Sequence, residues 1–191
     1  MNRLKLIINT GWTSVGGTIQ VAMGTLNELI AFKEHEYHVF LNRVLAGQLD
    51  RNRFPKNFIF YDISQLRFWQ YGFCWSKLEQ QISPDCVYSI FTPVFWRPRS
   101  KHLAGFARGH DIYRDYHYFD NWSLYATTRH TIRKLARMIS INRNVDAIIV
   151  ETDDIRQRLQ KELPGKEIIT ISNNCSYCYL KPIKFPNKLP E

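Results

Sequence analysis

The tripeptide Gly109-His110-Asp111 carries the residue types best suited to chemistry in this sequence. It follows an apolar run, residues 103–107, that predicts a buried strand, and ligands of parallel α/β proteins bind beyond the carboxyl ends of strands. A histidine there can titrate near neutral pH, donate a hydrogen bond or stabilise charge developing on a substrate. His110 and Asp111 are therefore candidate catalytic residues. A structural histidine bonded to the backbone is the alternative.

A second candidate site is the polar, glycine-containing loop over residues 10–18, which follows the first apolar run of the chain. Backbone N–H groups at the start of a helix face anions, so Gly16, Gly17 and Thr18 are candidate substrate-binding residues. The glycine spacing matches neither G-x-G-x-x-G nor G-x-x-x-x-G-K-[ST], so both standard nucleotide fingerprints are missing. A plain tight turn before a helix is the competing interpretation.

Three arginines, Arg129, Arg133 and Arg137, recur every four residues in a stretch with helical periodicity. That spacing places them on one helix face, and residues 127–145 contain no acidic side chain. Such a face suits acidic lipid head groups or a phosphate-bearing acceptor, so the three arginines are candidates for an anionic acceptor or membrane contact. A merely solvated helix face is the alternative.

Aromatic and basic residues alternate in two segments, 95–101 and 113–119. Aromatic rings beside cations suit stacking against sugar rings or against single-stranded nucleic acid. Arg114, in the second segment, is a candidate substrate-binding residue. An ordinary packed loop explains the same composition.

The 191 residues have ordinary globular composition, with 45% hydrophobic and 23% charged residues. This excludes a disordered or collagen-like chain. The net charge of +9 favours anionic partners. Cys175 and Cys178 form a single C-x-x-C pair, and a structural zinc site needs more ligands, so we expect no metal. Neither a signal peptide nor a membrane span is visible, which predicts a cytoplasmic protein, at most peripheral to a membrane.

Short apolar runs alternate with amphipathic stretches, a pattern typical of a parallel α/β sheet. The expected strands cover 4–9, 37–41, 58–61, 86–91, 103–107, 147–150 and 168–171, and the expected helices cover 18–30, 43–51, 64–82, 127–141 and 153–163. The helix over 64–82 is apolar around much of its circumference and should be well buried. Prolines at every fourth position mark the tail as a linker.

These pieces together resemble the N-terminal domain of GT-B fold glycosyltransferases, specifically the retaining family four, over nearly the whole chain. Its opening loop has a Gly-Gly pair, its second strand reads G-H-E-V-x-V, its fourth is entered through P-D-V-V-H, its fifth ends in T-x-H-D, and A-D-x-V-I opens its last region. The matching residues are Gly16-Gly17, Glu36–Phe40, Pro84–Tyr88, Gly109–Asp111 and Asp146–Val150, followed by Arg156, Leu159 and Ile168–Asn174.

The resemblance implies a Rossmann-like, doubly wound and mainly parallel sheet of about seven strands with helices on both faces. It implies a hexosyltransferase-like enzyme that moves a sugar from a nucleotide-sugar donor to a glycan or lipid-linked acceptor with retention, without a cofactor or metal. Gly16 and Gly17 would lie near the donor phosphates or the acceptor. His110 would face the transferred sugar.

The resemblance also divides the chain into an acceptor-binding domain over 1–175 and a linker-like tail over 176–191. The C-terminal, donor-binding domain of such enzymes is missing from this sequence, so we expect the 191 residues alone to be inactive. A separate polypeptide that supplies the donor site, with this chain as a partner subunit, is an alternative.

Two other classes compete with a glycosyltransferase. The charge and aromatics suggest a nucleic-acid-binding module, but the cations are dispersed and no recognition motif is visible, so we expect no nucleic-acid partner. The alternating pattern also fits a nicotinamide oxidoreductase, which the missing G-x-G-x-x-G disfavours.

Overall fold

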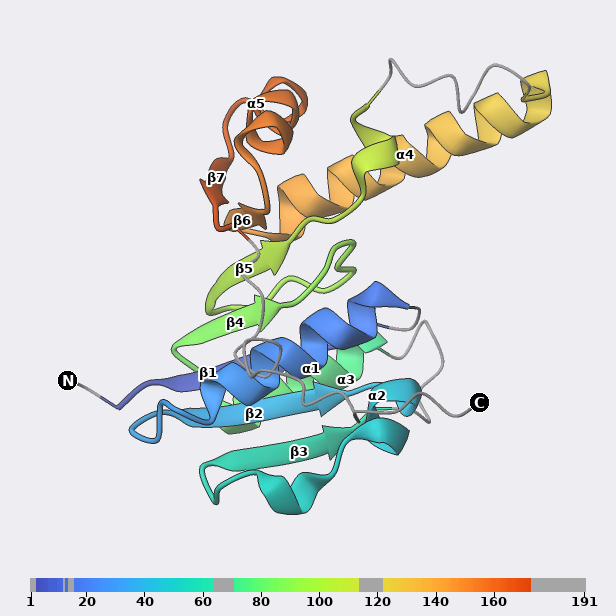
Figure 1. Cartoon of the computed structure of the whole chain (residues 1–191). Helices are drawn as coiled ribbons and strands as arrows, with labels where there is room; N and C mark the ends of the chain where they lie inside the picture. The colour runs from blue at the N-terminus through green and yellow to red at the C-terminus, as the bar shows by residue number, and fades with distance from the viewer. Residues whose placement is uncertain (1–2, 12, 14–15, 64–70, 114–121, 173–191) are drawn as a thin grey trace, which may run out of the picture.

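The computed structural model describes residues 3–11, 13, 16–63, 71–113 and 122–172, and its centre is one sheet of seven strands (Figure 1). The sheet order is β3-β2-β1-β4-β5-β6-β7, and all six neighbouring pairs are parallel. The strands are β1 (Lys5–Asn9), β2 (Glu36–Leu41), β3 (Phe58–Asp62), β4 (Cys86–Ser89), β5 (Lys101–Gly105), β6 (Ala147–Val150) and β7 (Glu167–Thr170). The predicted α/β Rossmann-like class is confirmed.

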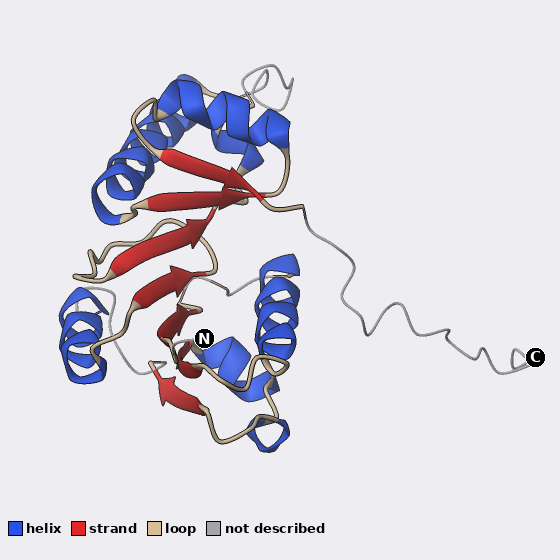
Figure 2. Cartoon of the chain, turned by 90° about the vertical axis from the view of Figure 1, so that its left-hand side faces the viewer, coloured by secondary structure: helices blue, strands red, loops and turns tan. Residues whose placement is uncertain are grey.

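Helices cover both faces of the sheet, and Figure 2 shows α1 and α3 on opposite sides of the strands. The α-helices are α1 (Gly17–Leu29), α2 (Arg43–Gln48), α3 (Tyr71–Ile82), α4 (Leu124–Asn144) and α5 (Asp153–Glu162), with short 3-10 turns η1 (Arg51–Arg53) and η3 (Gly109–Asp111). Among the helices that the structure describes, none is both long enough and apolar enough to cross a bilayer.

Two hydrophobic cores follow from this layering, because alternate residues of each strand point to opposite faces. One face of β1 and β2 packs Ile8 and Val39 against Ala22 and Leu26 of α1. The other core takes alternate residues of the strands and adds apolar side chains of α3, α4 and α5, among them Trp75, Met138, Ile141 and Leu159.

Capping residues explain where the helices begin. The side chains of Asn42, Ser123 and Thr152 accept hydrogen bonds from backbone N–H groups in the first turns of α2, α4 and α5. Ser123 therefore starts α4 at Leu124, three residues before the position that periodicity alone predicts.

The expectation that the helix over 64–82 is buried around much of its circumference is wrong. Trp75 and Ile82 of α3 are buried, but Phe73 is 75% exposed, so α3 has one packed face rather than burial around its circumference. The part of the expected helix over 64–70 lies outside the described residues. The apolar side chains of α4 also divide between two faces, and only one of these packs against the sheet.

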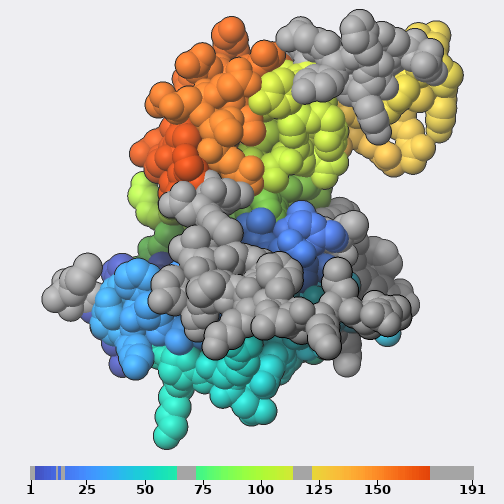
Figure 3. Space-filling view, viewed as in Figure 1, coloured from blue at the N-terminus to red at the C-terminus, as the bar shows by residue number. Residues whose placement is uncertain are grey.

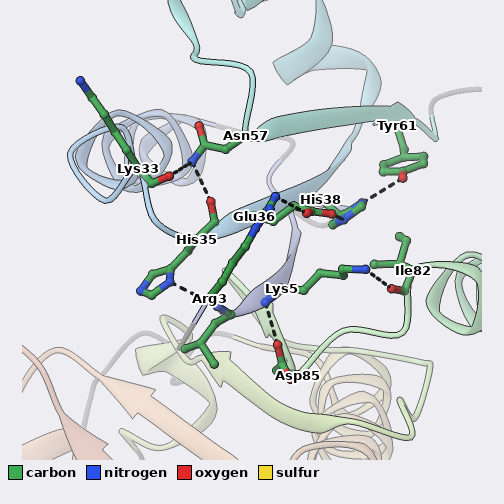
Figure 4. Close-up of polar contacts among 11 residues, drawn as sticks. Arg3, Lys5, Lys33, His35, Glu36, His38, Asn57, Tyr61, Ile82 and Asp85 are labelled. Carbon is green, nitrogen blue, oxygen red and sulfur yellow. Dashed lines mark hydrogen bonds and ion pairs between the residues drawn. The ribbon is translucent and has the colours of Figure 1, made fainter. Parts of the chain in front are cut away.

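Polar contacts tie the beginnings of the first strands together at the amino edge of the sheet (Figure 4). Arg3 donates to the Glu36 carboxylate at 2.7 Å, and Nε2 of His38 donates to the same carboxylate at 2.7 Å. The Tyr61 hydroxyl then donates to Nδ1 of His38 at 2.9 Å. The hydrogen bond from His38 is the main reason that the pKa of Glu36 lies below its usual value. These polar side chains at the amino edge therefore bind one another.

Candidate functional site

The loop after β1 lies at the point where the strand order reverses, because β1 pairs with β2 on one side and with β4 on the other. Parallel α/β sheets bind ligands at this switch point, beyond the carboxyl ends of the strands. Gly16 ends the loop with φ of 51°, a left-handed conformation that glycine adopts without strain. Gly16 and Gly17 are exposed, and Thr18 is half-buried in the first turn of α1.

Asn42, which follows β2, holds the described part of this loop in place. Its side-chain amide donates to the carbonyls of Thr10 at 2.8 Å and Thr13 at 3.0 Å, while its side-chain oxygen caps α2. The Thr10 hydroxyl donates to the Phe40 carbonyl at 2.7 Å. Sequence reasoning missed Asn42, although an asparagine between a strand and a helix is a typical N-cap.

Trp75 of α3 limits the space beneath the same loop. A Cβ atom at Gly11 would lie 2.9 Å from two ring carbons of Trp75, closer than real Cβ contacts. The Gly11 N–H donates to the side-chain oxygen of Asn9 at 2.9 Å. The described part of the loop therefore packs on a buried indole and is held by two asparagine side chains.

His110 and Asp111 lie in η3, directly beyond the carboxyl end of β5, as the sequence predicts for a ligand-facing turn. The Asp111 carboxylate, however, is fully buried. Both of its oxygens accept hydrogen bonds from Arg137 of α4, with Nε at 2.9 Å and Nη2 as the second donor. Arg108 lies 3.3 Å away and Nε2 of His130 3.5 Å away. Asp111 therefore faces the protein interior rather than a ligand.

The His110 side chain is about half exposed, at 49%, next to this buried carboxylate. Burial is the largest cause lowering the pKa of His110, Asp111 acts to raise it, and Arg108 and Arg137 act to lower it. The net result is that the pKa of His110 lies below its usual value, which favours the neutral form of the imidazole. A neutral, half-exposed histidine can donate or accept one hydrogen bond without adding positive charge.

The ligand atoms of His110, Asp111 and His130 lie within 4.8 Å of one another, which is close enough to consider a metal ion. The surroundings disfavour one, because Arg137 and Arg108 both face the carboxylate that would have to bind the cation. Two guanidinium groups would repel a divalent ion at this position. The cluster suits a buried anchor for η3 better than a metal centre.

The three arginines predicted to share a face of α4 do not share one environment. Arg129 and Arg133 are exposed, whereas the Arg137 side chain is 13% exposed and is bound to Asp111. The expectation that Arg137 belongs to the same open face is therefore corrected, because a buried carboxylate on the neighbouring turn draws it inward. Arg114 and the tail 176–191 lie outside the described residues.

The first aromatic and basic segment lies at the opposite edge of the sheet from His110. Its cations Arg97, Arg99 and Lys101 line an open pocket that also contains Asn144 and Asp146. Because Lys101 begins β5 and Asp146 precedes β6, this pocket belongs to the amino edge. It is separate from the switch point.

A buried serine and histidine, Ser89 and His102, form a second pair that sequence reasoning missed. The Ser89 hydroxyl donates to Nε2 of His102 at 2.8 Å, and Nδ1 donates to the carbonyl of Asn144. Burial is the main cause that lowers the pKa of His102 to about 4. Both side chains are almost fully buried, so this pair connects β4, β5 and α4 and is not a nucleophilic site.

Solved structures of glycosyltransferases share this fold. A glycosyltransferase from Rickettsia africae superposes with a TM-score of 0.61 at 13% identity over 98% of this chain. A UDP-glucose:anthocyanidin 3-O-glucosyltransferase, solved with UDP, gives 0.58 at 11% identity over 96% of this chain. A sucrose-phosphate synthase from Thermosynechococcus elongatus gives 0.54 at 10% identity, covering 92% of each chain.

At these identities the likeness is one of fold, and it supports the GT-B resemblance at that level. The chain spans about half of the Rickettsia enzyme, 47%, and 56% of the anthocyanidin glucosyltransferase. No protein-family model matches the sequence, and no curated protein matches it either.

Proposed function

We propose that this chain is the acceptor-side domain of a retaining, family-four glycosyltransferase. It would transfer a hexose from a nucleotide-sugar donor to a glycan or lipid-linked acceptor. The observation that carries the proposal is the carboxyl edge of the sheet, where the Gly16-Gly17 loop at the switch point and His110 after β5 occupy the same side. Only β4 separates β1 from β5, so the two loops begin about 10 Å apart, a span suited to a sugar phosphate.

In this proposal His110 faces the transferred sugar and acts through its neutral imidazole. A neutral ring can accept or donate a hydrogen bond at a sugar hydroxyl without repelling the positive charge that develops on an oxocarbenium-like sugar. Asp111 is then a positioning residue. Its buried pairing with Arg137 fixes η3 against α4 and so fixes the direction of the His110 ring.

The loop around Gly16, Gly17 and Thr18 offers backbone N–H groups at the start of α1, and no side-chain cap occupies that helix start. Phosphate oxygens of a donor suit such a position. The donor is a substrate here, and we propose no resident cofactor or metal. The two guanidinium groups beside Asp111 would repel a metal cation, which supports a proposal without a metal.

In this proposal, donor binding also needs residues of a second domain or of a partner subunit. Support comes from the coverage, since the Rickettsia enzyme and the anthocyanidin glucosyltransferase are each about twice as long as the matched part. We therefore propose that the 191 residues have little transferase activity without a second domain or partner subunit, and that they act in the cytoplasm near the inner face of the membrane.

The test is an NMR titration of the isotope-labelled chain with UDP-glucose, GDP-mannose and short glycans. The expected result is that shifts gather at Gly16, Gly17 and His110, and that His110→Ala weakens binding at least fivefold while Glu36→Gln at the amino edge leaves it unchanged. Shifts confined to the Arg97–Lys101 pocket would contradict the proposed site. Rapid sugar transfer by the chain alone would contradict the need for a second domain.

A further inference from the structure

The outward face of α4 carries an apolar stripe that no described part of the chain covers. Five large apolar side chains on this helix are between 47% and 85% exposed: Leu124, Tyr125, Ile132, Leu135 and Ile139. Figures 1 and 3 show the yellow, amino-terminal part of α4 extending beyond the strands at the outside of the molecule. Exposed apolar patches of this kind mark interaction surfaces.

The stripe is continuous and lies opposite the packed face of the helix. At about 100° per residue, the five side chains fall within an arc of about 100° and extend over about 22 Å of helix. The buried residues Met138 and Ile141 point to the other side, toward the sheet. The helix α4 therefore has two apolar faces, one packed in the core and one exposed to solvent.

The charges on α4 divide between the same two sides. The helix sequence contains five cations and no acid. The two inward cations are neutralised, because Arg137 is paired with Asp111 and Lys134 Nζ lies 3.0 Å from Glu162. The remaining three, Arg129, Arg133 and Arg143, are exposed, and no ion pair joins them to a carboxylate of the residues that the structure describes.

We propose that the outward face of α4 binds the surface of an anionic phospholipid membrane. Helices that lie in the plane of a bilayer combine an apolar stripe, which enters the head-group region, with arginines that meet acidic head groups. Arg129 and Arg133 flank the stripe on one side, and Arg143 borders it near the helix end. Charge complementarity favours this occupant, since a purely apolar protein interface would leave three like charges at its rim. The proposal does not depend on sugar transfer.

The test uses the full chain and sedimentation with sucrose-loaded vesicles of phosphatidylcholine alone or with 30% phosphatidylglycerol. We expect binding to the anionic vesicles only, and weaker binding at 0.5 M salt because exposed charges are then screened. In hydrogen exchange, the anionic vesicles should slow exchange over residues 124–139 of the unaltered protein. This second measurement needs no substitution.

Paired variants separate the apolar and charged contributions. Ile132→Gln with Leu135→Gln, and separately Arg129→Gln with Arg133→Gln, should each lower the partition coefficient about tenfold or more. Arg53→Gln with Lys56→Gln removes the same charge from an exposed region near η1 and should leave binding unchanged. Phe73→Gln is the matched control for loss of an exposed apolar side chain on another helix. Circular dichroism should show every variant folded, because none of these side chains is buried.

Four results would overturn the proposal. These are failure of the unaltered chain to bind anionic vesicles, equal binding to neutral vesicles, full binding by either α4 variant, and loss of binding in the control variants. Self-association that Ile132→Gln with Leu135→Gln abolishes would assign the stripe to a second copy of the chain. A failed sugar-binding titration with normal vesicle binding would count against the proposed function alone.

Discussion

The two edges of the sheet use charge in different ways. At the amino edge, side chains close on one another and on strand ends, as when Lys5 donates through its backbone to Asp85 at 2.7 Å and through its side chain to the Ile82 carbonyl at 3.0 Å. At the carboxyl edge, Asp111 and Arg137 are buried together, while His110 and the Gly16-Gly17 loop beside them stay accessible. A buried ion pair can therefore support an open site without being part of it.

The largest effect is expected where the support of the carboxyl edge is removed. Asp111→Asn leaves the Arg137 guanidinium largely buried without its anion, beside Arg108, and should lower the free energy of unfolding by about 3 kcal/mol. Urea unfolding measures this. A double-mutant cycle with Arg137→Gln should show strong coupling, and a loss below about 1 kcal/mol would mean that the pair is not an anchor.

The next effect concerns the buried His102. Its pKa is about 4 in the folded protein against an ordinary 6.5, so the unfolded chain binds more protons between these values. The free energy of unfolding should therefore fall by about 3 kcal/mol as the pH drops from 6.5 to 4, and level off below that for this group. Unfolding at several pH values tests this. An equally steep pH dependence in His102→Gln would assign it to other groups.

A smaller effect is expected at the amino edge. Glu36→Gln keeps the side-chain shape but removes the negative charge that Arg3 and His38 share, and should cost about 1 kcal/mol of unfolding free energy. Ligand shifts at Gly16 and Gly17 should not change. A change there would show that the two edges are coupled.

The smallest change in stability is expected at the residue with the largest proposed role. His110→Ala should alter the free energy of unfolding by less than about 0.5 kcal/mol, because the side chain is half exposed. The same variant should weaken ligand binding at least fivefold in the NMR titration. A large loss of stability with unchanged binding would make His110 a structural residue.

Periodicity in the sequence determined the strands and helices, because a buried parallel sheet needs short apolar runs separated by amphipathic stretches. It predicted β6 without error, and it placed Gly16 and His110 beyond strand ends, where parallel strands must open their loops. Local spacing also showed that Arg129, Arg133 and Arg137 lie near one another on a helix.

Only the tertiary structure decided which of these side chains are exposed and which are buried or paired. Arg137 turns inward because Asp111, 26 positions earlier in the chain, is buried beside it. Ile132 and Leu135 remain in solvent because the sheet takes up only one side of α4. Helical spacing fixes which side chains share a face, but what covers that face depends on contacts between segments far apart in sequence.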